Sequence, residues 1–189
     1  LFADAVKMVK KSPLLAKRIE FAGGEGREFS MAHHASASFF RPVSRDTGRT
    51  GSGPRPFFVL VDEVHELPDR RIIEMLERGF KFRREPLLFM ITNSGSDRTS
   101  VCWEEHEHAV KVRDGDLDDP ELLVVIYAAD PDDDITSEAT WRKANPNLGI
   151  TPKLEFIRAE AEAASQSPRK ENDFKRFHLG IWTEQTIRW

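Results

Sequence analysis

The chain has 189 residues, 39% of them apolar and 32% charged, which is an ordinary composition for a globular protein with one sizeable core. The net charge of −4 excludes an overall basic nucleic-acid binder, although a local basic patch can bind DNA on an acidic protein. The single cysteine, Cys102, cannot form an internal disulfide, which is typical of a reducing compartment.

No apolar run approaches the ~20 residues needed to span a bilayer, and the first residues lack the pattern of a signal peptide. We therefore expect no membrane association. The chain begins with Leu1 rather than methionine, in a stretch of helical character. We expect it to be a fragment of a longer protein.

The first third of the chain predicts short elements. Residues 2–21 carry apolar side chains at helical spacing, interrupted at Ser12-Pro13, so two short helices are predicted. Residues 23–44 predict a pair of short strands after a glycine turn. Residues 44–56 are rich in Gly, Pro, Ser and Arg, which indicates an exposed loop.

The middle of the chain alternates between continuous apolar runs and amphipathic stretches. The apolar runs predict strands buried on both faces of a parallel sheet, at residues 57–63, 86–94 and 121–129. The stretches between them predict two helices, one capped by Asp69 and the other by Thr99 or Ser100. Strand, helix, strand, helix, strand is typical of an α/β sheet with right-handed crossovers.

The character of the sequence changes after about residue 130. An acidic turn and a loop-like stretch, "WRKANPNLGITP", are followed by two amphipathic helices, predicted at 153–165 and 169–180. We therefore place a domain boundary near residue 135, with an α/β core over 1–135 and a small helical subdomain over 136–189.

The apolar run "FFVLVDE" ends in two adjacent carboxylates, Asp62 and Glu63. Four apolar residues followed by Asp-Glu form the Walker B pattern of nucleotide-hydrolysing α/β domains. At the carboxyl end of a buried strand, Asp62 can hold Mg²⁺ and Glu63 can orient and deprotonate a water for attack on a γ-phosphate. The alternative is a strand that ends in a solvated acidic turn.

The next predicted strand ends in three small polar residues, Thr92, Asn93 and Ser94. In a parallel sheet they lie at the same edge as the carboxylates, where hydroxyl and amide groups can bond an attacking water or a γ-phosphate. The alternative is an ordinary turn that opens the following helix. The two strand ends together favour a nucleotide site more than either does alone.

One expected part of a nucleotide site is missing from the sequence. No G-x-x-x-x-G-K-[ST] phosphate loop occurs, and the glycines of "GGEGRE" neither precede Lys-Ser/Thr nor follow an apolar strand. Either the protein is not a nucleotide hydrolase, or the loop precedes Leu1. We expect the chain alone to be inactive and to bind ATP very weakly.

Four blocks of the sequence resemble the large terminase subunit of tailed bacteriophages, the motor that packages DNA into the prohead. In chain order they are "SGPRPFFVLVDEVHELPDRR", "PLLFMITNSGSDRTSVCWEEHEHA", "WRKANPNLG" and "FHLGIWTE". The resemblance covers residues 40–189, and its most specific part is the run from Ile91 to Trp103.

The resemblance implies a RecA-like, additional-strand ATPase fold with a mostly parallel sheet flanked by helices. On this basis residues 1–135 are part of an ATPase domain whose phosphate loop lies upstream, and residues 136–189 are a linker or lid that leads to a metal-dependent nuclease. Asp62 is then the Mg²⁺ carboxylate and Glu63 the catalytic base. Thr92, Asn93 and Ser94 match the coupling motif that links hydrolysis to movement.

The resemblance also implies cofactors, partners and a location. These are ATP with Mg²⁺, double-stranded DNA, a portal protein, a small terminase subunit and a homo-oligomeric ring, acting in the cytoplasm of the bacterial host. Some family members carry an arginine before Walker B that reaches a neighbouring subunit's ATP. Ser52 occupies the position before Gly53 here, so if such an arginine exists, Arg49 is the candidate.

Two other interpretations remain open. Asp62-Glu63-Val64-His65 also spells a DExH box, which favours a fragment of a superfamily-two helicase. Without a phosphate loop, the chain is also compatible with a non-catalytic assembly module left from a prophage terminase.

Overall fold

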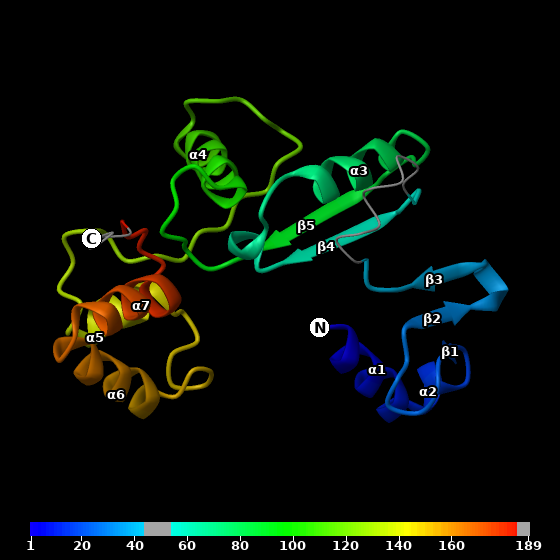
Figure 1. The fold of residues 1–189 in the computed structure, drawn as a ribbon, viewed down its shortest axis with the longest axis horizontal. Helices are drawn as coiled ribbons and strands as arrows, with labels where there is room; N and C mark the ends of the chain where they lie inside the picture. Colours follow the sequence, from blue (N-terminus) through cyan, green and yellow to red (C-terminus); the bar gives the residue numbers. More distant parts are fainter. Residues whose placement is uncertain (44–53, 185–189) are drawn as a thin grey trace. The chain divides into compact units, whose positions relative to one another are not determined.

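The computed structural model describes residues 1–43 and 54–184. The chain divides into two compact units, Leu1–Gly53 and Pro54–Trp189. Figure 1 shows the order of their helices and strands.

The first unit contains short helices followed by a small antiparallel sheet in the order β1-β2-β3. Its elements are α1 (Phe2–Lys11), α2 (Pro13–Ala16), β1 (Glu20–Ala22), β2 (Ser30–His33), η1 (His34–Ser36) and β3 (Ser38–Phe40). Ser12 caps α2, because its hydroxyl accepts a hydrogen bond from the backbone N–H of Leu15 at 3.4 Å. The two predicted helices and the two predicted strands are confirmed.

The prediction of helix up to residue 21 was wrong at its end. Residues 20–22 form the edge strand β1, in which Phe21 pairs with Met31 of β2. Met31 is buried, at 6% exposure. Pairing with a strand ten residues away therefore overrides the local helical spacing, which a single segment cannot reveal.

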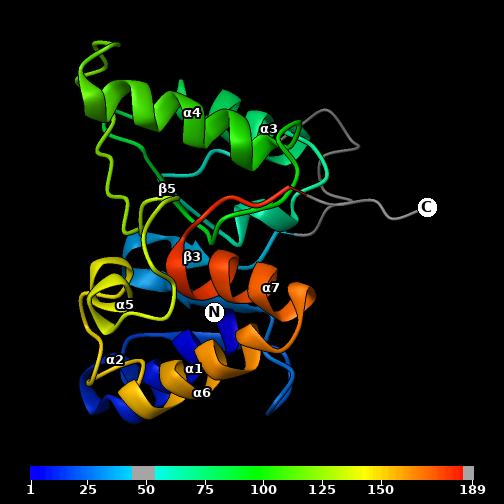
Figure 2. The same ribbon diagram turned by 90° about the vertical axis from the view of Figure 1, so that its left-hand side faces the viewer.

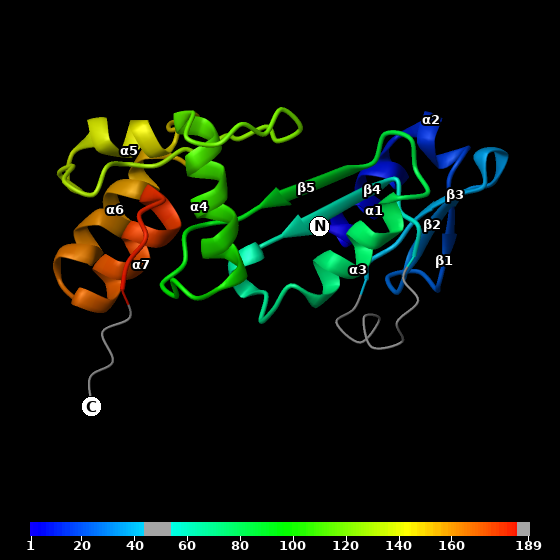
Figure 3. The same cartoon turned by 90° about the horizontal axis from the view of Figure 1, so that it is seen from above.

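The second unit is built on a two-stranded parallel sheet of β4 (Phe58–Asp62) and β5 (Leu87–Ile91). The chain crosses between the strands through η3 (Val64–Glu66) and α3 (Arg71–Phe80). Asp69 accepts a hydrogen bond from the backbone N–H of Arg71 at 3.0 Å, at the start of α3. Figure 3 shows the two strands side by side and running in the same direction.

Only one face of this sheet is covered within the described part of the chain. Side chains from the covered face join a core formed with η3, α3 and α4, whose buried members are Val64, Ile73, Val101 and Cys102. The opposite face remains exposed, with Phe58 at 46%, Leu87 at 52% and Phe89 at 48%. The prediction that both strands are buried on both faces is therefore wrong for the described residues, because a single helical layer can cover only one face.

Helix α4 (Val101–Asp114) follows β5 and has the predicted start. Ser100 is the cap, because its hydroxyl accepts from the backbone N–H of Trp103 at 3.2 Å. The helix ends at Gly115, whose φ of +81° is the left-handed conformation that glycine adopts without strain.

The third predicted strand, over residues 121–129, does not form. Residues 122–129 have no regular secondary structure, and their exposure alternates, with Leu123 at 88%, Val125 at 63% and Tyr127 at 61%. They pair with no strand of the described chain. At its end the backbone N–H of Ala129 donates to the carbonyl of Leu179 at 2.9 Å. Side-chain pattern alone predicted this strand, whereas a strand also needs a partner for its backbone groups.

The rest of the unit is a group of three helices, α5 (Glu138–Ala144), α6 (Leu154–Ser165) and α7 (Pro168–Leu179). Figure 2 shows α6 and α7 packed together, with α5 next to them. The core of the group is centred on Trp141, Ile157, Phe174 and Leu179. Both predicted amphipathic helices are confirmed.

Helix α5 includes residues 141–144, which were predicted as loop. Ser137 caps it, and the indole N–H of Trp141 donates to the carbonyl of Ile135 at 2.7 Å. Burial of the Trp141 ring stabilises this short helix. No helix within residues 1–43 and 54–184 combines the length and the apolar character needed to cross a bilayer.

We expect Ile157→Ala to destabilise the three-helix group. Ile157 has no exposed surface, so truncation leaves a cavity that costs about 2–5 kcal/mol. The matched control is Ile150→Ala, because Ile150 is 74% exposed and its truncation should cost less than about 0.5 kcal/mol. Hydrogen exchange of α6 and α7 peptides measures the difference, and equal protection in the two variants would contradict this core.

Candidate functional site

The ends of β4 and β5 lie together because the two strands are parallel neighbours in register. Asp62 pairs with Ile91, so Glu63 and Thr92 are the first residues past the ladder on each strand. The two polar segments predicted from the sequence therefore leave the sheet at the same edge, where α/β folds bind ligands.

Glu63 adopts an unusual backbone conformation. Its φ of 53° and ψ of 53° are left-handed, which is uncommon for a residue with a side chain. Such strain persists only where the surroundings hold it, and it is often found at functional sites. The Glu63 side chain is half exposed, so its carboxylate is accessible at the sheet edge.

Asp62 is the last residue of β4 and is exposed. Mg²⁺ usually binds through one or two protein carboxylates together with substrate phosphates. A single accessible aspartate at this edge is therefore a suitable donor for a magnesium–nucleotide complex.

Thr92 connects the two strand ends through its hydroxyl. The oxygen accepts a hydrogen bond from the backbone N–H of His65 at 3.1 Å, and the hydroxyl donates to the carbonyl of Asn93 at 2.9 Å. The Cys102 thiol lies 3.5 Å away on α4, and burial raises the pKa of that thiol. Thr92 is thus anchored to elements on both sides of it.

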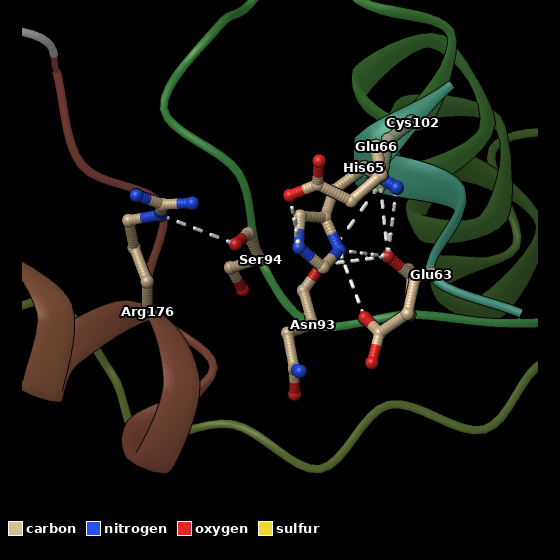
Figure 4. Close-up of polar contacts among 8 residues, drawn as sticks. Glu63, His65, Glu66, Asn93, Ser94, Cys102 and Arg176 are labelled. Carbon is tan, nitrogen blue, oxygen red and sulfur yellow. Dashed lines mark hydrogen bonds and ion pairs between the residues drawn. The ribbon is translucent and has the colours of Figure 1, made fainter.

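His65 was considered in the sequence only as part of a DExH spelling, yet its ring is central to the site (Figure 4). The side chain is 7% exposed, with Nδ1 3.0 Å from the Thr92 hydroxyl and 3.3 Å from a Glu63 carboxylate oxygen. On the other side of the ring, Nε2 lies 3.3 Å from a Glu66 carboxylate oxygen. The Asp-Glu-x-His pattern was the signal that could have pointed to this residue.

Ser94 and Gly95 meet the three-helix group. Ser94 is buried at 8% exposure, and its carbonyl accepts a hydrogen bond from Nε of Arg176 on α7 at 3.4 Å (Figure 4). A Cβ at Gly95 would lie 2.7 Å from the ring of Trp182, the third residue after α7, so a side chain at this position would force the tryptophan to shift. These contacts join residues more than eighty positions apart, and no local pattern could have indicated them.

The Trp182 ring also packs against Trp103 of α4, in an edge-on arrangement with 4.7 Å between ring centroids. The Arg98 guanidinium lies over the Trp103 ring, 4.9 Å from its centroid.

Five of the predicted site residues, Asp62, Glu63, Thr92, Asn93 and Ser94, lie at one edge of the sheet, where β4 and β5 end. Arg49 lies outside the described residues.

Two family models match the chain. The model described as "Terminase large subunit, ATPase domain" matches residues 1–111, and "Terminase large subunit, endonuclease domain" matches residues 116–189. The ATPase match ends and the endonuclease match begins about twenty residues before the domain boundary predicted near residue 135.

The chain is also similar to two individual proteins. The chain is 32% identical over 140 residues to Protein YmfN of Escherichia coli (strain K12), which covers 74% of this chain and 31% of that protein. It is 25% identical over 181 residues to the terminase large subunit of Enterobacteria phage HK97, which covers 95% of this chain and 34% of that protein. The chain thus spans about a third of the length of these relatives.

The fold also matches a solved structure, the crystal structure of the HK97 bacteriophage large terminase. The TM-score is 0.81 at 25% identity, over 96% of this chain and 36% of that one. The α/β, RecA-like fold class is therefore confirmed, and so is the resemblance to terminases in preference to helicases. With an ATPase-domain model matching more than half of its residues, the chain belongs to the terminase large subunit family.

Proposed function

We propose that this chain is part of a viral DNA-packaging motor, in which ATP hydrolysis drives translocation of double-stranded DNA into a prohead. The observation that carries the proposal is the placement of Asp62-Glu63 beside Thr92-Asn93-Ser94, at the ends of adjacent parallel strands. Membership of the terminase family supports the same role.

Asp62 would hold Mg²⁺, which when bound neutralises charge on the β- and γ-phosphate oxygens. Glu63 accepts a proton from the attacking water and holds that water in line with the γ-phosphate. Its half-exposed carboxylate and its constrained backbone suit this task, because the group is accessible and its direction is fixed.

Thr92, Asn93 and Ser94 would couple hydrolysis to movement. Thr92 bonds to the segment that carries the Walker B carboxylates, whereas the Ser94 carbonyl bonds to Arg176 of the helical group. A change at the γ-phosphate therefore has a short path from the sheet edge to the helices. Coupling requires contacts that differ between the state with and the state without the γ-phosphate. We therefore propose that the segment Thr92-Asn93-Ser94 makes these contacts.

The chain supplies half of the proposed nucleotide site. No residue run in it matches the glycine-rich loop with Lys-Ser/Thr that cradles phosphates, so we expect the 189 residues alone to bind ATP very weakly. ATPase activity is accordingly proposed for the complete gene product.

The wider assignment follows the same proposal. We propose that the ATPase domain extends to residue 135, past the start of the endonuclease match at residue 116, and that residues 136–189 within that match form a linker or lid subdomain that leads into the nuclease. The complete protein would act as a homo-oligomeric ring with a portal protein and a small terminase subunit, in the cytoplasm of the bacterial host. An arginine acting on a neighbouring subunit's ATP, if there is one, would be Arg49.

We expect Glu63→Gln in the complete protein to retain ATP binding and to lose turnover. General-base catalysis contributes about 10²–10⁴-fold to a rate, so kcat should fall by at least about 10²-fold. The control is Glu74→Gln on α3, which removes an exposed carboxylate that lies 3.8 Å from the Arg78 guanidinium. Turnover at the wild-type rate in Glu63→Gln would refute the base assignment.

We expect Asn93→Ala to separate hydrolysis from packaging. ATP should still be hydrolysed because Asp62 and Glu63 remain, but fewer base pairs of DNA should be packaged for each ATP consumed. Simultaneous measurement of phosphate release and of nuclease-protected DNA in an in vitro packaging assay gives this ratio. An unchanged ratio would contradict a coupling role, and a wild-type protein with no ATPase activity would favour the non-catalytic assembly module.

A further inference from the structure

His65 contacts Glu63, two residues before it, and two residues that are distant in sequence, Thr92 and Phe177. Its Nδ1 lies between the Glu63 carboxylate and the Thr92 hydroxyl (Figure 4). Its ring centroid lies 6.2 Å from that of Phe177 on α7. Aromatic rings at this separation pack against each other. At 7% exposure, the imidazole has little freedom to turn away from these partners.

The other hydrogen bonds of Thr92 bear on whether its hydroxyl or Nδ1 of His65 is the donor in the contact between them. The Thr92 hydroxyl has one proton, which it gives to the carbonyl of Asn93, and its oxygen already accepts the backbone N–H of His65. The tautomer with a proton on Nδ1 satisfies both contacts of this nitrogen, because it can donate to the Thr92 oxygen at 3.0 Å and because the Glu63 carboxylate, 3.3 Å away, can only accept. That N–H faces the Thr92 oxygen and the Glu63 carboxylate together.

Helix α7 bounds the ring from the other direction. Phe177 packs against the imidazole, and the neighbouring Arg176 donates to the carbonyl of Ser94. The two residues thus attach α7 to both strand ends, one through η3 and the other through the segment after β5. A shift of α7 would move the ring that Glu63 faces.

We propose that His65 is a positioning residue that orients the Glu63 carboxylate through Nδ1, and that Phe177 makes this orientation depend on the position of α7. The inference rests on the proposed ATPase function, since it assigns the control of the proposed base. It links the helical group, which matches the endonuclease family, to the sheet edge of the ATPase domain.

Three substitutions at His65 in the complete protein test the first part. Asparagine places an amide near the position of Nδ1, whereas glutamine places it near Nε2 and alanine removes both. We expect His65→Ala and His65→Gln to lower kcat for ATP by about 10- to 100-fold while KM stays within about twofold, because orientation and not binding is lost. We expect His65→Asn to restore most of kcat.

Thermal melting and binding of a fluorescent ATP analogue accompany the kinetics, so that misfolding is recognised. If His65→Ala fails to fold, the comparison of the asparagine and glutamine variants carries the test. Equal kcat in all variants and wild type overturns the proposal, and so does an equal loss in the asparagine and glutamine variants. A wild-type protein without ATPase activity instead refutes the proposed function.

The second part is tested with a matched pair of phenylalanines. Phe177 is 41% exposed and packs on His65, whereas Phe156 on α6 is 50% exposed and packs on His178 with 5.7 Å between centroids. We expect Phe177→Ala to lower kcat by about 3- to 10-fold and Phe156→Ala to leave it unchanged. Equal effects of the two substitutions would show that α7 acts on the site only through general stability, and would overturn this part.

Discussion

The parallel pairing of β4 with β5 is the interaction on which the rest of the second unit depends. Five residue pairs, from Phe58–Leu87 to Asp62–Ile91, set the register. A slip by one residue would turn each side chain to the opposite face and separate Glu63 from Thr92. The apolar side chains that face α3 and α4 therefore hold the polar strand ends in place, although none of them belongs to the site.

Residues that match the endonuclease family pack directly against residues that match the ATPase family. Trp182 falls within the match to the endonuclease domain, yet it packs with the core beneath β4 and β5, beside Gly95 and Trp103. Arg176 and Phe177 extend the same contact to the strand ends. Residues beyond the ATPase match in the sequence therefore still contribute to the packing of the structure that the ATPase match covers.

Elements defined by local pattern were predictable from the sequence. The β4 and β5 runs, the cap at Ser100 and the apolar stripes of α6 and α7 all depend on residues close together in the chain. The parallel order of the strands followed from the helix between them, and with it the meeting of Glu63 and Thr92. Half of the candidate site was thus accessible from spacing alone.

The errors concern distant partners. Residues 121–129 have the composition of a strand, but only the folded chain shows that no described strand bonds to them. The exposed face of the sheet and the contacts of Arg176 and Trp182 depend on segments far away in sequence. The sequence showed His65 as part of a motif, whereas its contact with Phe177 of α7 depends on the folded chain.

The contact between Gly95 and Trp182 has a consequence for how this family can vary. With 2.7 Å between the tryptophan ring and the place of a Cβ, the indole occupies the volume that any other residue at position 95 would need. Any side chain at position 95 would therefore require Trp182 to move, although 87 residues separate the two positions in the sequence. A relative that keeps a large aromatic ring at position 182 should keep glycine at 95, and one that has lost the ring is free to diverge there.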